Sequence, residues 1–100
     1  MIRIQVKKDN QKFKQITFKG HANYEERGKD IVCAAASATY GCTVNAILSL
    51  NSHTIQINSS EDIQIIDVLE YDEVTEKLLE NMITCLKSIE KKYPKNIKIR

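Results

Sequence analysis

Two residues in this 100-residue chain could form a nucleophile and its base, namely Cys33 and His21, which are twelve positions apart. Asp30 precedes an apolar run and is predicted to cap a helix, because its short carboxylate can accept hydrogen bonds from free N–H groups of the first turn. Cys33 then lies in that turn, where the positive end of the helix dipole and nearby N–H groups favour thiolate over thiol. We therefore hypothesise that Cys33 is a catalytic nucleophile and that His21 is its base.

Each of these residues also has a purely structural interpretation. A cysteine at a helix start can be a small buried apolar residue, and His21 could simply hold a hydrogen-bond partner at a strand end. Asp30 could orient His21, or it could serve as a helix cap alone. The combination favours catalysis, because a strand that ends at Gly20 and a helix that starts after Asp30 can bring the two side chains within hydrogen-bond distance.

Neighbouring residues could support this chemistry. Ser37 lies one helical turn after Cys33 on the same face. Its hydroxyl could bond the sulfur or a substrate atom, or instead the carbonyl of Cys33 in its own helix. Free N–H groups at the helix start could form an oxyanion hole. The loop 22–29, with Gly20 and Gly28 as hinges, is either a gate over the site or a plain surface connection.

Composition predicts one soluble domain spanning residues 1–100, since 42% of the residues are hydrophobic and 28% are charged. The net charge of +2 is too mild to indicate direct binding to nucleic acid, which usually needs a strongly basic face. The three cysteines fit neither a disulfide framework nor a conventional metal site. We therefore expect a cytoplasmic, reducing compartment and neither a metal nor another cofactor, with Cys42 and Cys85 buried among apolar neighbours.

The segment from Ile31 to Ser60 contains no charged residue, and its first twenty residues have a helical composition. That length could cross a bilayer. Serine, threonine and asparagine interrupt it, so a core helix is favoured over a membrane span, and no membrane association is expected. The lack of charge predicts that the helix is covered on most sides, by a sheet, by a second helix or by a second copy of the chain.

Periodicity predicts the elements that position these residues. Alternating polarity predicts strands, and apolar residues at every third or fourth position predict a second helix. The strands are expected at 2–8, 12–19, 54–58, 63–68 and around 97–99, and the helices at 31–50 and 73–93. The alternation of the first strand argues against a signal peptide. The order β-β-α-β-β-α-β predicts an α+β fold, a two-layer sandwich in which a mixed or antiparallel sheet carries two helices on one face.

The segment from Gly20 to Ser37 is the specific part of a resemblance to a known family. The resemblance is carried by Gly20-His21-Ala22, by residues 28–34 and by Ser37-Ala38, with further agreement at 44–46 and 86–93. At these positions the chain resembles the ribosomal-processing cysteine protease family called Prp, and similarity spans essentially the whole chain. The sequence departs from the family at 58–62, where it has no glycine although relatives often carry a glycine-containing turn.

The resemblance implies a small homodimeric bacterial cysteine endopeptidase. Family members remove a short N-terminal extension from a large-subunit ribosomal protein, cutting after a hydrophobic, aromatic-containing motif. By position, Cys33 matches the nucleophile and His21 the base, while Gly20 and Ser37 match supporting active-site positions. Residues 22–32 match a flexible loop that must move for substrate to enter. The partners implied are therefore that extension and a second copy of the chain.

The favoured hypothesis is a cysteine endopeptidase that uses a Cys-His dyad, because no third member is evident in the sequence. One alternative is a non-catalytic ribosome-associated binding module, in which the loop and the helix start form a docking surface. Another is a cysteine-dependent acyl transferase or hydrolase that acts on small molecules. Replacing Cys33 with alanine separates the first two, because a binding module keeps its effect whereas a protease keeps binding its substrate and stops cutting it.

Overall fold

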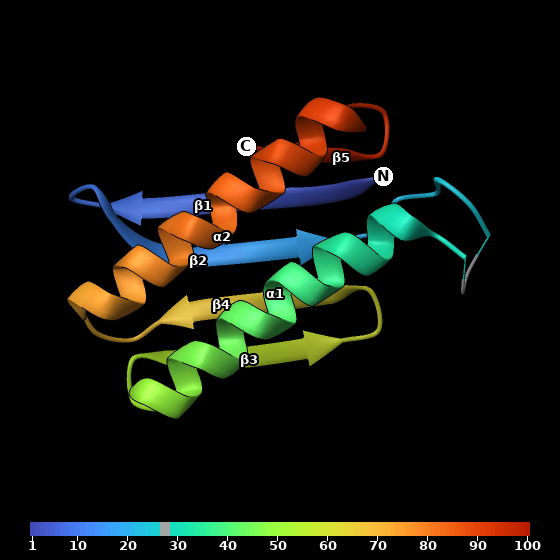
Figure 1. Ribbon diagram of the computed structural model, residues 1–100. Helices are drawn as coiled ribbons and strands as arrows, with labels where there is room; N and C mark the ends of the chain where they lie inside the picture. Colours follow the sequence, from blue (N-terminus) through green and yellow to red (C-terminus); the bar gives the residue numbers. More distant parts are fainter. Residues whose placement is uncertain (27–28) are drawn as a thin grey trace.

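In residues 1–26 and 29–100, which the computed structural model describes, the chain folds into five strands and two helices in the predicted order (Figure 1). The elements are β1 (Ile2–Asp9), β2 (Lys12–Lys19), α1 (Ile31–Leu50), β3 (Ile55–Ser60), β4 (Ile63–Val68), α2 (Glu73–Lys92) and β5 (Ile97–Ile99). The predicted bounds hold to within two residues. The predicted hinge at Gly28 lies outside the described residues.

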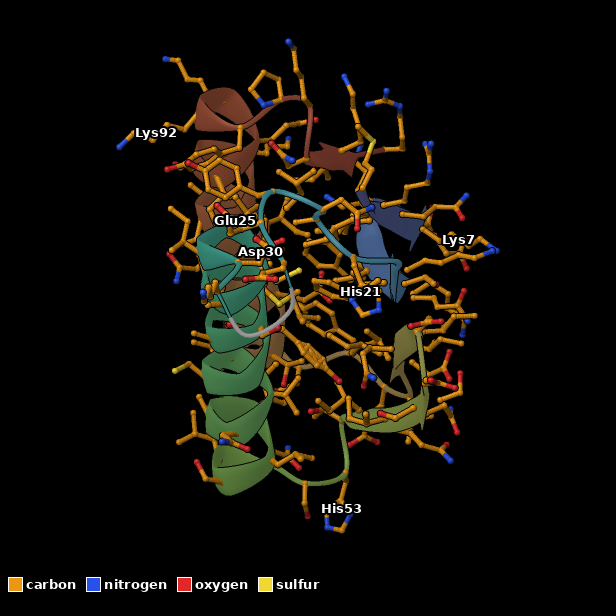
Figure 2. The ribbon with its side chains drawn as sticks, turned by 90° about the vertical axis from the view of Figure 1, so that its right-hand side faces the viewer. Lys7, His21, Glu25, Asp30, His53 and Lys92 are labelled. Carbon is orange, nitrogen blue, oxygen red and sulfur yellow. The ribbon has the colours of Figure 1, made fainter. Side chains whose placement is uncertain are left out.

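The strands form one mixed sheet in the order β3-β4-β2-β1-β5. Neighbouring strands pair antiparallel except β1 and β5, which are parallel. Both helices lie on one face of the sheet (Figure 1), so the molecule has two layers when it is seen from the side (Figure 2). The predicted α+β two-layer sandwich is therefore confirmed. The end of β2, the turn between β3 and β4 and the start of α1 all lie at one end of the molecule (Figure 1).

The core lies between the sheet and the helices. Alternate strand residues point into it, among them Ile4, Ile16 and Ile66, which are fully buried. The inward face of α2 repeats every three or four residues and consists of Thr75, Leu79, Met82 and Leu86. Because each buried aliphatic side chain of this size contributes about 1.5–3 kcal/mol, this layer holds the two helices on the sheet.

The inward face of α2 differs from the prediction at Cys85. That residue was expected among apolar neighbours and is exposed, as is Val74 (52%) near the start of the helix. Thr75 is buried in place of Val74, because its hydroxyl lies 2.9 Å from both the Thr54 hydroxyl and the Asp72 carboxylate that caps the helix. These hydrogen bonds satisfy the buried hydroxyl, and they fix the rotation of α2 about its axis.

Within one chain the surface of α1 is covered on one side, and the expectation that a second copy of the chain covers its other sides stays a prediction. Its buried residues are Val32, Ala36, Val44 and Ile47. Elsewhere on the helix Ile31, Leu48 and Leu50 are 53%, 39% and 66% exposed, and Cys42, which was expected in the core, is exposed too. By length and composition alone this helix could cross a membrane. In the folded chain one side of it belongs to the core, and the remainder is uncharged and exposes apolar side chains together with Ser37, Asn45 and Ser49.

Candidate active site

Asp30 fixes both the start of α1 and the loop before it. Its Oδ1 accepts hydrogen bonds from the N–H groups of Val32 and Cys33, both at 3.0 Å. Its Oδ2 accepts from the N–H of Tyr24 at 3.0 Å and from that of Glu25 at 3.4 Å. Burial raises the pKa of Asp30, but these four hydrogen bonds outweigh it, so the pKa lies below its ordinary value. The predicted helix cap is confirmed, and the same carboxylate also ties the loop to the helix.

These bonds overturn one expectation about the helix start. The N–H groups of Val32 and Cys33 are taken by the Asp30 carboxylate, and the N–H of Ala34 donates to the Asp30 carbonyl at 3.0 Å. The predicted oxyanion hole of free N–H groups is therefore wrong for these three residues. The physical reason is that a capping side chain uses up the same donors that an uncapped first turn would leave free.

The sulfur of Cys33 is half-buried and lies against the backbone of the loop. It accepts a hydrogen bond from the N–H of Ala22, with 3.1 Å between nitrogen and Sγ. Ala22 is held in place because its carbonyl accepts from Nδ2 of Asn96 at 3.0 Å. Donation to sulfur stabilises a thiolate more than a thiol. Because Ala22 directly follows His21, this bond also brings the histidine segment to the sulfur.

His21 has a carboxylate partner that the sequence did not identify. Its Nε2 lies 2.8 Å from Oδ1 of Asp62 in the turn between β3 and β4, and the two side chains are 42% and 58% exposed. The carbonyl of Asp62 accepts from the N–H of Gly20 at 3.0 Å, which holds the turn beside the end of β2. Figure 2 places His21 on the sheet side and Asp30 at the start of α1. The hydrogen bonds of Asp30 described above go to the backbone, so Asp62 is the carboxylate that contacts the imidazole.

Gly20 is required at the end of β2 by the backbone geometry. Its φ is +87°, and an added Cβ would lie 2.6 Å from the carbonyl oxygen of Met1. A side chain fits neither that conformation nor that space. The glycine therefore lets the chain leave the strand so that His21 and Ala22 reach the start of α1.

Two adjoining hollows of about 400 and 420 Å³ connect these residues. His21, Cys33 and Ser37 line both hollows, while Asp30 borders the first and Gly20 borders the second. The structure thus brings together the predicted site residues that lie in its described part. A half-buried cysteine and a histidine in one hollow are suited to nucleophilic catalysis.

Both hollows combine polar and apolar side chains. The first has Asn23 and Glu25 in its wall. The second has the acidic turn residues 61–62 in its wall together with the rings of Phe18 and Tyr40, which meet edge-on with 5.0 Å between centroids. Burial raises the pKa of Tyr40, so its hydroxyl stays protonated. The second hollow can accordingly accept an apolar or aromatic group.

Comparison with known proteins gives the chain a family. The family described as cysteine protease Prp matches residues 1–98. The chain belongs to this family. It is 35% identical over 94 residues to the ribosomal processing cysteine protease Prp of Staphylococcus aureus, covering 91% of this chain and 89% of that protein. It is also 31% identical over 87 residues to the Prp of Bacillus subtilis, covering 80% and 78% of the two chains.

Solved Prp structures share the fold along the whole chain. One is S. aureus Prp with a covalently linked product peptide, which matches with a TM-score of 0.95 and 33% identity over 100% of this chain and 98% of that one. Another is S. aureus Prp with a substrate peptide, with a TM-score of 0.88 and 31% identity over the same shares. The predicted family and the predicted enzyme class are confirmed, and this chain is a cysteine protease of the Prp family.

Among residues 1–26 and 29–100, no group of three or more His, Cys, Asp or Glu side chains could hold a metal ion.

Proposed function

We propose that this chain is an endopeptidase that removes the N-terminal extension of a large-subunit ribosomal protein, with Cys33 as nucleophile and His21 as base. One observation carries the proposal. The Cys33 sulfur lies in the first turn of α1, accepts the Ala22 N–H at 3.1 Å, and shares a hollow with His21. The names of the Prp relatives, which are ribosomal processing proteases, support the choice of substrate.

The proposed reaction starts when His21 takes the proton of the Cys33 thiol. The thiolate attacks the scissile carbonyl carbon, and negative charge moves from sulfur to the carbonyl oxygen. The Ala22 N–H already lies next to the sulfur, and the Ser37 hydroxyl lines both hollows, so these two groups are the proposed donors to the oxyanion. His21 then protonates the leaving amine, and water hydrolyses the thioester.

The proposed substrate motif fits the second hollow. Cleavage after a hydrophobic, aromatic-containing motif requires an apolar subsite next to the nucleophile. Ile2, Phe18 and Tyr40 lie in the wall of the second hollow, which Cys33 also lines, and they form an apolar part of it beside the acidic turn 61–62. Aromatic side chains prefer edge-to-face contacts with other rings, so an aromatic substrate residue would extend the existing Phe18–Tyr40 pair.

We also propose that the protein acts as a cytoplasmic homodimer. Ile31, Leu48 and Leu50 on α1 are apolar and more than a third exposed, and the helix has no charged residue. A second copy of the chain that covers this surface would remove it from water, which favours association. Free cysteines at positions 33, 42 and 85 support a reducing compartment.

The test is cleavage of a synthetic peptide that spans the extension of the ribosomal protein from the same organism. Wild type is expected to yield two fragments by mass spectrometry, whereas Cys33→Ala binds the peptide and leaves it intact. Cys85→Ala is the matched control, because Cys85 is an exposed cysteine on the other helix, and it should cut like wild type. Cleavage by Cys33→Ala, or an intact peptide with wild type, would refute the proposal. The second result together with retained ribosome binding would favour the non-catalytic binding module.

A further inference from the structure

We infer that Asp62 is a positioning residue that completes a Cys33, His21 and Asp62 arrangement, an inference that rests on the proposed roles of Cys33 and His21. The Asp62 carboxylate contacts the imidazole of His21 directly, with 2.8 Å between Oδ1 and Nε2. It holds the ring in one orientation and determines which ring nitrogen receives the thiol proton.

A backbone hydrogen bond and the strand register both hold Asp62 beside His21. The backbone of the β3–β4 turn is attached to the end of β2, because the Asp62 carbonyl accepts from the Gly20 N–H at 3.0 Å. The strands themselves fix the register, since Lys19 pairs with Ile63 immediately beside the turn. The side-chain bond from Asp62 then reaches the residue after Gly20. A carboxylate that is anchored through its own backbone loses little further entropy when it binds the ring.

The bond assigns a tautomer to the neutral imidazole. An ionised carboxylate can only accept hydrogen bonds, so Nε2 of His21 must carry the hydrogen. The lone pair is then on Nδ1, which is the atom that can act as the base. In the reaction the Cys33 S–H bond breaks and its proton moves to Nδ1, which gives a thiolate and an imidazolium. The Nε2–H stays bonded to Asp62, and Nδ1 later returns its proton to the leaving amine.

Asp62 lies in the exposed turn between β3 and β4. Since Asp62 is 58% exposed, replacing it removes the contact to His21 without opening a cavity in the core.

The experiment compares Asp62→Ala and Asp62→Asn with wild type in two measurements. The first is steady-state cleavage of the peptide described above. Both variants are expected to lower kcat about three- to tenfold, as for a partly exposed charged contact, with KM unchanged within about twofold. The control is Asp9→Asn, which changes an exposed carboxylate at the end of β1 and should keep wild-type kinetics.

The second measurement is the ¹H–¹⁵N correlation spectrum of the imidazole side chains above neutral pH. The chain has two histidines, His21 and His53, so the signals can be assigned with a His53→Gln variant. Wild type and Asp9→Asn are expected to show the Nε2–H tautomer at His21, and Asp62→Ala a mixture of both tautomers. Unchanged kcat with an unchanged tautomer would overturn the inference, and so would a rise in kcat, which would make Asp62 a restraint on His21. If wild type fails to cut the peptide, the proposed function is wrong, while the tautomer still decides whether Asp62 positions the ring.

Discussion

Replacing Gly20 with alanine is expected to destabilise the protein and to displace His21. A non-glycine residue in the left-handed region costs about 1–2 kcal/mol, and Gly20 has a φ of +87°. The added Cβ would also lie 2.6 Å from the Met1 carbonyl oxygen. That peptide group cannot move away freely, because the adjoining Ile2 N–H donates to the Asn96 carbonyl at 2.9 Å. The chain must instead shift at Gly20, which strains the hydrogen bond from Gly20 N–H to the Asp62 carbonyl, worth about 0.5–1.5 kcal/mol.

Together these effects predict that Gly20→Ala lowers the free energy of unfolding by about 2–4 kcal/mol. For a domain of this size the melting temperature should fall by about 10–20 °C, measured by circular dichroism. Activity should fall as well at temperatures where the variant is still folded, because a misplacement of about 1 Å can cost about a hundredfold in rate.

Gly41→Ala is the matched control for stability. Gly41 lies inside α1, and an added Cβ there meets no atom within 4 Å. Alanine is the better helix former by about 0.5–1 kcal/mol, so this variant should melt a few degrees above wild type. A melting temperature of Gly20→Ala equal to that of wild type, or a shift of both variants in the same direction, would contradict this prediction.

Two further predictions concern the helix cap and the exposed side of α1. Because the pKa of Asp30 lies below its ordinary value in the folded chain, the charged cap contributes stability that is complete above pH of about 4 and is lost as the pH falls through the lower folded value. Asp30→Asn should therefore lower the free energy of unfolding at pH 7 by about 1–2 kcal/mol, measured by urea unfolding. The difference from wild type should shrink below pH of about 4, and a difference that grows on acidification would contradict this. Leu48→Asp is expected to weaken dimerisation at least about a hundredfold, measured by light scattering, because it places a charge in the proposed interface. Val74→Asp, on the exposed side of α2, should leave the wild-type oligomeric state unchanged. A Leu48→Asp variant that dimerises like wild type would exclude this part of α1 from the interface.

The order of the elements could be predicted because each depends on local signals. Alternation predicts the strands, and Asp30 is recognisable as a cap because a short carboxylate before an apolar run satisfies N–H groups in its own vicinity. Which helix residues face solvent was harder to predict than the order of the elements. Cys42 lies in a helix without any charged residue, so no polar side marks which residues face solvent. On α2 the burial of Thr75 depends on Thr54, which is 21 residues earlier in the chain.

The contact between His21 and Asp62 could not be predicted for a related reason. The two residues are 41 positions apart, and they meet only because β2 and β4 are neighbours in one particular register. A shift of one residue would turn the side chains of β4 to the opposite face of the sheet. The sequence contained the polar turn 58–62, but the pairing of β2 with β4 is a property of the whole sheet.

Backbone contacts position the loop of the site, and a side-chain contact orients the imidazole. Ala22 donates to the sulfur of Cys33 through its N–H and accepts from Asn96 through its carbonyl, so the loop, α1 and the segment before β5 meet at one residue. Gly20 controls the direction in which the chain reaches that residue, whereas Asp62 acts on the imidazole from an exposed position. Substitution at Gly20 should consequently change stability and activity together. Substitution at Asp62 should change kcat alone, and this contrast distinguishes positioning by the fold from positioning by a single carboxylate.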